Sequence, residues 1–507
     1  MTGRIFTPRW VLLFRLSCRL PSVFLAGLVA VACTTNVSTG KRQLVLMDME
    51  EEAEIGRAAH PRILAAYGGA YDDARVARYV SDIVDRIGAA TVQPGQSKPA
   101  YVSTVLDSAI VNAFALPGGY VYVTRGLIAL ANDEAELAGV IAHEIGHVNA
   151  RHVAERQAAA TGSSLIGGLL GAVIGGGMVD KLVAFGSESL LAGYSREQEA
   201  EADRLAVGYL TLAGYDPYAV RDFLQSMNAY AAFQAELIGE DYDGSQSGWL
   251  STHPATVDRV SDTARDAAAA VARVGSPNAS GRKRSAYLTA VDGLLYGDNP
   301  DDGYVRGTRF VHAIEGYQFE VADGFQLTNT PNAVWALGPN KTIVKFDSAE
   351  KSADADIAYY LRDVWAVQLA VHDVQRFELN GMQAASARTR LQGLNTLIVA
   401  VAFSPNQVYR FLIGIAPQMG AQYDEVVRNM IASFRRLSAA EKASIGPWRV
   451  TVVQPTKAMS IVDAASLMAS DDFPLARFRL LNGRTQAEIL GDEPIKIIIE
   501  DVRAGSS

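Results

Sequence analysis

The feature that most constrains this chain is a pair of histidines four residues apart, His143 and His147, with Glu144 directly after the first. Asp133, followed three residues later by Glu136, is the pattern that begins a helix with a capping box. Apolar residues then recur at spacings of three and four, as in a helix with one face in a core: Leu137, Val140, Ile141, Ile145 and Val148. Residues four apart lie one turn apart on the same helix face, so both imidazoles are expected to project together.

Two imidazole nitrogens in this arrangement can bind one tetrahedral Zn²⁺, and Glu144 lies beside them to take a proton from water. The five-residue pattern alone also fits two surface histidines on an amphipathic helix. A third ligand from a separate element would favour the metal site.

An acidic segment, residues 195–203, supplies a candidate for that ligand. It predicts a helix that runs to about residue 213 and ends at Gly214. Glu199 can provide the third ligand. Asp203, one turn later, can accept a hydrogen bond from a ligating histidine and fix its tautomer. Without the histidine pair, this helix would be interpreted as a solvated acidic face.

Together the two segments resemble the BepA/LoiP/HtpX-like family of gluzincin metallopeptidases, which also includes the CAAX prenyl proteases. The resemblance covers about residues 36–270 and points to the periplasmic lipoprotein branch of that family. It implies one Zn²⁺ per chain, bound by His143, His147 and Glu199 rather than by Glu201.

The same resemblance assigns a peptide-binding strand. Residues 112–119 form a turn-rich stretch that is similar to the segment before the family's substrate-binding edge strand, and residues 120–124 read as that strand. An extended peptide would add to it through main-chain hydrogen bonds, which read little sequence. Unfolded or misassembled proteins are therefore the expected substrates. The expected catalytic base is Glu144, and the expected substrate contacts are Tyr120, Val121, Tyr122 and Val123.

Residues 252–259 are similar to the His-Pro pair and the trailing arginine of the BepA-like branch. That similarity implies that His253 can be a fourth zinc ligand. Three protein ligands leave a position for water, whereas four describe a closed site, so the site would be gated by movement of this loop. In the alternative, His253 only caps the following helix. Arg259 either stabilises the oxyanion during catalysis or braces the loop.

The first 32 residues have the pattern of a secretory signal peptide, with four arginines, no acidic residue and a final apolar run that ends in small residues. Residues 30–33, Ala-Val-Ala-Cys, resemble a bacterial lipobox, which implies a lipid on Cys33. Thr34 follows in place of aspartate, which favours attachment to the outer membrane, facing the periplasm. The alternative is an uncut membrane anchor or a free thiol, although 12 apolar residues are few for a span.

At 507 residues, with 49% hydrophobic and 20% charged residues, the chain is long enough for about three domains with buried cores. Its net charge of -9 offers no basic face for nucleic acid. We expect an α+β multidomain chain in this order: a signal peptide at 1–32, a mainly helical metallopeptidase domain with a small sheet at 33–274, a linker at 275–306, an α+β domain at 307–440 and a small module at 445–507.

The two C-terminal parts carry resemblances of their own. Residues 307–440 alternate as strands and resemble a PsbP-like sandwich. His312 and His372 lack ligand spacing there, so we expect a binding or scaffold role. Residues 445–507 follow the order strand, two helices, strand, which is similar to the LysM module that holds peptidoglycan sugars. Asn482 matches that module but its usual Gly-Asp-Thr is absent, so glycan binding and a degenerate packing module both stay open.

A glycine-rich apolar stretch without charge, residues 161–178, lies between the two metal-binding segments. A single membrane crossing there would separate the zinc ligands, so we expect a mobile flap over the cleft, which could still dip into a membrane. His60 and His152 have no partner motif and are expected to be surface or capping residues.

These patterns favour a zinc-dependent metalloendopeptidase of the bacterial cell envelope, anchored by lipid, that hydrolyses unfolded or misassembled periplasmic and outer-membrane proteins. The alternative is a chaperone or assembly factor with a mostly latent zinc site. The presence of Glu144 together with all three expected ligands favours the protease.

Overall fold

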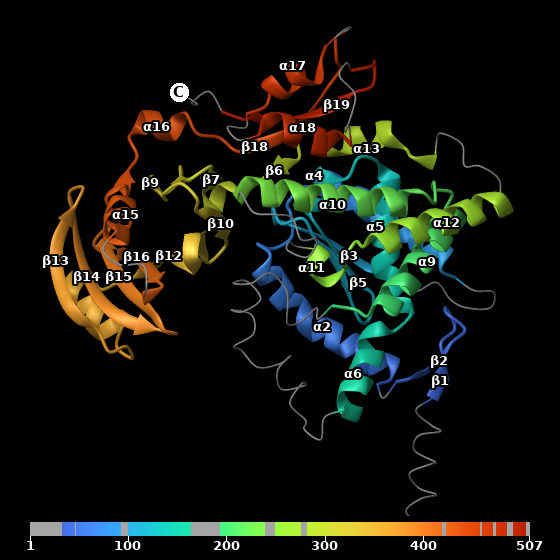
Figure 1. The fold of residues 1–507 in the computed structure, drawn as a ribbon, viewed down its shortest axis with the longest axis horizontal. Helices are drawn as coiled ribbons and strands as arrows, with labels where there is room; N and C mark the ends of the chain where they lie inside the picture. The colour runs from blue at the N-terminus through green and yellow to red at the C-terminus, as the bar shows by residue number, and fades with distance from the viewer. Residues whose placement is uncertain are drawn as a thin grey trace, which may run out of the picture.

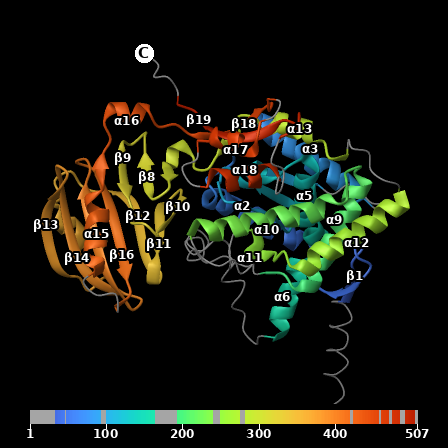
Figure 2. The same ribbon diagram turned by 45° about the horizontal axis from the view of Figure 1, so that its top comes forward.

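The computed structural model describes residues 33–45, 47–92, 100–163, 193–238, 249–274, 281–417, 422–456, 459–469, 473–483 and 490–502. Two bodies lie side by side, a helical part that contains both histidines of the pair and a part built on a large curved sheet (Figure 1). The last segment of the chain lies over the helical part and not over the sheet, as Figure 2 shows from a second direction.

One nearly solvent-free helix, α5 (Glu134–Asn149), is central to the helical part, and every residue from 134 to 147 is buried. The Asp133 carboxylate accepts the backbone N–H of Glu136, as predicted. The Glu136 carboxylate bonds instead to the backbone N–H of Asn132, so the capping box is not closed. The helices around α5 are α2 (Met49–Ala66), α3 (Ala74–Ala90), α4 (Arg125–Leu130), α6 (His152–Ser163), α9 (Arg196–Leu212), α10 (Ala219–Ile238), α11 (Trp249–Thr252) and α12 (Val257–Val274).

A three-stranded sheet lies against these helices in the order β3 (Val102–Leu106), β5 (Tyr120–Thr124), β4 (Ala113–Leu116). The prediction that Tyr120, Val121, Tyr122 and Val123 bind a peptide is wrong. β5 pairs in parallel with β3 on one side and antiparallel with β4 on the other, so both of its edges are occupied. The reason is the stretch before it, expected to be only turns. It forms β4 and then reverses through Gly118 and Gly119, both at positive φ.

The large sheet has seven antiparallel strands in the order β10-β11-β12-β16-β15-β14-β13. Four short strands form a second sheet in the order β17-β9-β8-β7, and α15 (Gln422–Ala432) contributes to the core that the two sheets share. Between β12 and β13 the chain forms a short α14 (Ile357–Tyr359) followed by a π-helical turn (Tyr360–Trp365). The strands are β7 (Tyr304–Arg306), β8 (Arg309–His312), β9 (Tyr317–Glu320), β10 (Gln326–Thr330), β11 (Ala333–Gly338), β12 (Thr342–Glu350), β13 (His372–Leu379), β14 (Met382–Leu391), β15 (Leu394–Ala402), β16 (Gln407–Ile415) and β17 (Arg435–Arg436).

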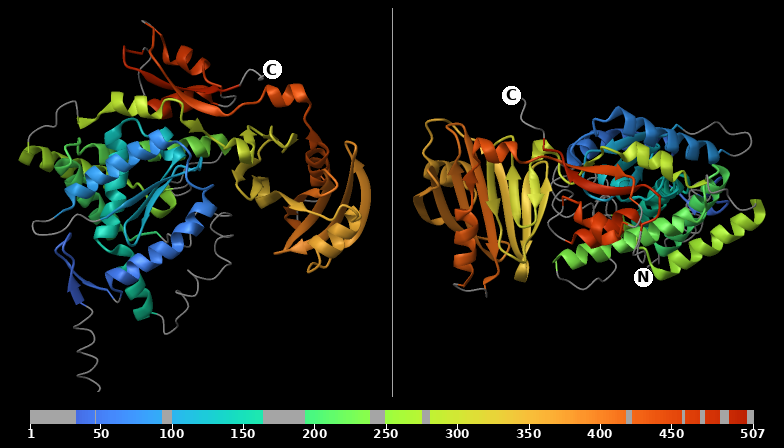
Figure 3. Two further views of the ribbon diagram at one scale, coloured as in Figure 1. Left: turned by 180° about the vertical axis from the view of Figure 1, so that it is seen from behind. Right: turned by 90° about the horizontal axis from the view of Figure 1, so that it is seen from above.

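The C-terminal module has the predicted order, β18 (Trp448–Val453), α17 (Ile461–Ser466), α18 (Pro474–Asn482) and β19 (Ile495–Glu500). The predicted linker at 275–306 is wrong for its described residues. They form α13 (Arg284–Val291) and β6 (Leu295–Tyr296), and β6 pairs with β18. One apolar core includes residues of α5, α13, β18 and β19, so the module packs as part of the helical body, which Figure 3 shows from behind and from above.

At the other end of the chain, β1 (Cys33–Thr35) and β2 (Arg42–Leu44) form a hairpin. Among the described helices, none combines the length and the apolar run that a membrane crossing requires. The predicted signal peptide and nearly all of the glycine-rich segment lie outside the described residues, apart from the end of α6 at Ser163.

Candidate metal centre

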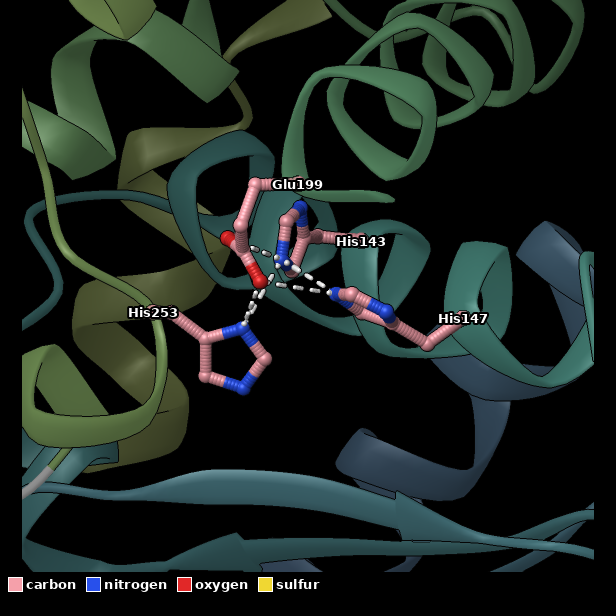
Figure 4. A group of neighbouring side chains, drawn as sticks. All are labelled: His143, His147, Glu199 and His253. Atoms are coloured by element: carbon pink, nitrogen blue, oxygen red, sulfur yellow. Dashed lines mark hydrogen bonds and ion pairs between the residues drawn. The ribbon is translucent and has the colours of Figure 1, made fainter. Parts of the chain in front are cut away.

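Helices α5 and α9 cross closely, and this crossing brings the predicted ligands together. Gly146 makes the close approach possible, because a Cβ at this position would lie 3.2 Å from the carbonyl oxygen of Ala202. Ser195 caps the first turn of α9, and Glu199 lies on the face of that helix that meets α5. His143, His147, Glu199 and His253 point toward one point from three elements (Figure 4).

The donor atoms of these four side chains lie within 4.8 Å of one another, and all four side chains are buried. The Nε2 atoms of His143 and His147 are 3.0 Å apart, and the Nε2 of His147 is 3.4 Å from a Glu199 oxygen. The Nδ1 of His253 is 3.3 Å from the Nε2 of His143 and 2.9 Å from Glu199. Tetrahedral zinc with bonds of about 2.0–2.1 Å has ligand atoms about 3.3 Å apart. The donor set and its spacing therefore fit Zn²⁺.

Asp203 and Arg259 surround the ligands. Asp203 lies 2.9 Å from the Nδ1 of His143, as predicted, and this contact turns the Nε2 of His143 toward the site. The guanidinium of Arg259 donates two hydrogen bonds to Asp203, one to the Pro254 carbonyl and contacts Glu199 at 2.7 Å. Of the two roles left open for Arg259, this geometry supports the brace. Its donors are directed at the loop and the ligands and leave little for an oxyanion.

Burial and charged neighbours shift the pKa values of the ligands in different directions. Burial raises the pKa of Glu199, but its contacts with His253 and Arg259 outweigh burial and hold that pKa well below its usual range. Burial lowers the pKa of His143, yet hydrogen bonds to Asp203 and Glu199 raise it to about 9. Burial holds the pKa of His147 well below its usual range. Glu199 is thus an anionic carboxylate and His147 a neutral imidazole, which are the ligand forms that a divalent cation binds.

Glu144 lies on the same helix turn as His143 and is buried with the centre. Its Oε1 accepts a hydrogen bond of 2.9 Å from the indole N–H of Trp249 and lies 3.7 Å from the Nε2 of His253. The Trp249 ring stacks on the His253 ring at 4.7 Å between centroids. Tyr194 stacks on His147 at 3.8 Å from the other side. Aromatic rings thus cover both the base and the ligands.

The expectation that His60 and His152 are surface or capping residues is wrong. His152 is fully buried, and its Nδ1 lies 2.8 Å from the Nδ1 of His147. Its Nε2 lies 3.3 Å from Glu201, which was expected to be a surface residue and is only 13% exposed. His60 is half-buried on α2, where its Nδ1 lies 2.7 Å from the hydroxyl of Tyr122.

No periodic pattern in the sequence predicts that His152 contacts His147, because His152 follows a reversal of the chain after α5. Arg151 adopts a positive φ of 57° there. Trp249 and Tyr194 were also missed, and both are aromatic residues outside long helices. The only signal for them is closeness in sequence, since Tyr194 comes directly before the Ser195 cap and Trp249 lies four residues before His253.

Two histidines and a glutamate on crossing helices, with a second glutamate beside them as base, define a metallopeptidase of the gluzincin type. Residues 73–266 match the model of Peptidase family M48. Over these residues the chain is similar to that family, which supports a zinc metalloendopeptidase domain that contains the four donor residues.

Known proteins match part of the chain. The mitochondrial metalloendopeptidase OMA1 of Schizosaccharomyces pombe is 30% identical over 228 residues, which are 44% of this chain and 63% of that protein. The beta-barrel assembly-enhancing protease of Escherichia coli is 31% identical over 161 residues, 30% of this chain and 31% of that protein. The chain thus spans less than two thirds of the length of these relatives.

The likeness to solved structures is much weaker. Cyanobacterial PsbP (CyanoP) from Synechocystis aligns with 25% of this chain and 91% of its own, at 11% identity and a TM-score of 0.22. That score is too low to carry an argument about function.

Proposed function

We propose that this protein is a zinc-dependent endopeptidase of the bacterial cell envelope that hydrolyses unfolded or misassembled periplasmic and outer-membrane proteins. The observation that carries the proposal is the buried group of His143, His147 and Glu199 beside Glu144 on one helix. The name of the Escherichia coli relative, a protease that enhances beta-barrel assembly, is in keeping with such a substrate class.

The chemistry follows from the roles of the side chains. Bound zinc would polarise the scissile carbonyl and lower the pKa of water. His143, His147 and Glu199 would hold the ion, and the contact with Asp203 keeps the Nε2 of His143 directed at it. Glu144 would take the proton from the attacking water and later deliver it to the leaving amine.

The substrate strand is proposed at β4 instead of β5. The backbone N–H of Thr124 bonds to the carbonyl of Asn112, which fixes the alternation of paired and unpaired residues along β4. Ala113 and Ala115 then direct their N–H and C=O groups to the edge away from β5. Among the described residues no strand pairs with that edge. An extended peptide could add there, next to His147, which lines one small cavity with Ala115.

Helix α11 and the residue after it would gate the site. The backbone N–H of Trp249 bonds to the carbonyl of Val111 at the start of β4, and the Trp249 side chain bonds to Glu144. His253 supplies the fourth donor. A four-ligand centre is closed to water, so α11 would have to move before hydrolysis. This closure is also what favours the second candidate function, a chaperone or assembly factor whose zinc site is mostly latent.

The other parts of the chain are proposed to control location. Cys33 would carry a lipid that anchors the protein to the outer membrane in the periplasm. Equal [³H]palmitate labelling of Cys33→Ala and wild type would contradict this.

The sheet-containing part would bind or scaffold substrate proteins. The C-terminal module would bind peptidoglycan, although the Asn482 amide is engaged with Phe478 and Lys496 backbone groups. Sedimentation of the full chain with purified peptidoglycan tests that role, and its failure would leave a packing module.

The decisive experiment compares wild type and Glu144→Gln on casein and on an unfolded porin, with zinc measured by mass spectrometry. We expect about 10²–10⁴-fold slower hydrolysis by the variant at unchanged zinc content, the usual contribution of a general base. Equal hydrolysis by both proteins would defeat the protease proposal.

The gate is tested on the same substrates with His253→Ala. Raised hydrolysis is expected if His253 closes the site. Unchanged or lower hydrolysis with normal zinc would count against gating.

A further inference from the structure

A chain of polar contacts leads outward from the ligand His147 to the N-terminal hairpin. The Nδ1 of His147 lies 2.8 Å from the Nδ1 of His152, and the Nε2 of His152 lies 3.3 Å from an oxygen of Glu201. The other oxygen of Glu201 lies 2.8 Å from the Nζ of Lys41, which stands between β1 and β2. These contacts join α5, α6, α9 and the hairpin.

The protons in this chain can be assigned from the chemistry of the ligand. A histidine that presents Nε2 to a metal carries its proton on Nδ1, so His147 donates to the Nδ1 of His152. His152 then carries its own proton on Nε2 and donates to Glu201. The carboxylate accepts from His152 on one oxygen and from Lys41 on the other. Every link has one donor and one acceptor, and the only net charges, on Glu201 and Lys41, neutralise each other at the outer end.

Local structure explains why His152 is available for this contact. The helix ends at Ala150, and Arg151 takes the left-handed conformation that terminates many helices. Its guanidinium holds that reversal by bonding to Glu52 and to the carbonyl of Met47. The chain therefore turns back, and His152 begins α6 with no exposed surface.

The hairpin is fixed to the same end of α5 by a second contact. The side-chain N–H of Asn36, a buried residue, donates 2.9 Å to the carbonyl of Asn149 in the last turn of the helix. The Oδ1 of Asn36 accepts the backbone N–H groups of Ser38 and Thr39, which shapes the turn that carries Lys41. The position of Lys41 relative to Glu201 is thus set by the docked hairpin.

We infer that His152, Glu201 and Lys41 are positioning residues that hold the His147 imidazole in its metal-binding tautomer and orientation and that tie this ligand to the N-terminal hairpin. The two ligating histidines then differ in the partner of their Nδ1 atom. His143 bonds directly to the carboxylate of Asp203, whereas His147 reaches its carboxylate through a second, neutral histidine. This inference rests on the proposed role of His147 as a zinc ligand.

The test measures binding of zinc alone to the full chain by competition with a chelator, together with the visible spectrum of the Co²⁺-substituted protein. His152→Leu, which removes the acceptor, should weaken zinc binding by about 10–100-fold, the usual effect of losing such a partner. His152→Asn, whose Oδ1 can replace the Nδ1 acceptor, should recover much of the affinity. Glu201→Gln should have a smaller effect, and Lys41→Ala, at a residue with 58% of its side chain exposed, the smallest.

Glu197→Gln is the matched control, because Glu197 lies on the same helix as Glu201 and is exposed. Wild-type zinc affinity and an unchanged Co²⁺ spectrum in both His152→Leu and Glu201→Gln would overturn the inference. If His152→Leu fails to fold, Glu201→Gln decides alone, and wild-type zinc affinity with an unchanged Co²⁺ spectrum in that variant would overturn the inference. Failure of the proposed function would instead appear as zinc-loaded wild type that does not cleave casein, a result that leaves these affinities unaffected.

Discussion

The helical part and the sheet part of this molecule bury very different side chains. Across the helical part and its C-terminal module, the buried charged or ligating residues are Glu52, Arg125, Asp133, Glu134, Glu136, His143, Glu144, His147, His152, Glu199, Asp203, His253, Arg259 and Lys496. Among the described residues between 307 and 440, no Asp, Glu, Lys or Arg is buried, and His312 is the only buried histidine. The sheet core is instead a cluster of aromatic rings around Phe346.

The buried charged and ligating residues are thus concentrated in the part that holds the candidate metal site. A buried charge costs free energy unless it is paired and hydrogen-bonded, so a chain keeps many of them only where they are needed. In the helical part they are paired. Glu134, for example, accepts from Tyr79, Arg86, Tyr215 and Lys283 at the start of the metal helix. The sheet part has the ordinary composition of a packed core.

The largest expected effect is the loss of zinc binding in Glu199→Gln, which tests whether the helical part holds the metal. The amide keeps the shape of the side chain but offers a much weaker ligand, so zinc affinity should fall by more than the roughly 10–100-fold typical of outer partners. Hydrolysis should be lost with it. Glu197→Gln on the same helix should bind zinc as wild type does, and zinc content by mass spectrometry compares the two. Full zinc binding by Glu199→Gln would mean that the centre lies elsewhere.

Part of this group could be predicted from local patterns, whereas the choice of Glu199 over Glu201 and the place of His253 came from the family resemblance. Spacing along a helix brings His143 and His147 to one face, and an acidic helix offers Glu199 and Asp203 one turn apart. The contact of His152 with His147 could not be predicted in this way. It depends on the left-handed backbone conformation of Arg151, which an arginine in the sequence does not predict.

The fold, like the site, could be predicted only in part. Helices with strong periodicity and the strand and helix order of the C-terminal module were found where expected. The central place of β5 was not predicted, because pairing with β4 is decided by a tight hairpin. The docking of residues 281–296 on the module was missed as well, since the polar stretch at 275–285 has the composition of a linker, although the apolar residues after it include the strand that pairs with β18.

A second test asks whether the sheet part can be destabilised without disturbing the metal site, and it changes Phe346. This side chain is 2% exposed and contacts several rings of the sheet core. Phe346→Ala should lower the free energy of unfolding of the sheet part by about 3–5 kcal/mol, the usual cost of such a cavity. Zinc content should not change. Leu337→Ala, at an exposed position of β11, should cost less than about 0.5 kcal/mol. Guanidinium unfolding measures both, and loss of zinc in Phe346→Ala would contradict the separation.

The smallest expected effect concerns Lys496, a buried lysine without a carboxylate partner. Its Nζ donates to the carbonyls of Ala129 and Ala131 at 2.7 Å each, where α4 ends and the chain enters the metal helix. The last carbonyls of a helix lack partners within it, so the amine satisfies acceptors that would otherwise be buried without a hydrogen bond. Lys496→Met should therefore lower the free energy of unfolding of the helical part by about 1–3 kcal/mol. Lys345→Met in the sheet part is the control.

The pH dependence of that variant tests the same contact. Burial lowers the pKa of Lys496 to about 7, helped by Arg284. An unfolded lysine titrates near about 10.4, so between roughly pH 7 and 10 the unfolded state binds more protons than the folded state. The stability contributed by Lys496 must then rise with pH through this window and be lost as pH falls toward 7. The gap in unfolding free energy between wild type and Lys496→Met should widen from pH 7 to pH 9. A gap that narrows would show that the charged amine is the better partner for these carbonyls, and that the C-terminal module is held to the metal helix mainly by charge.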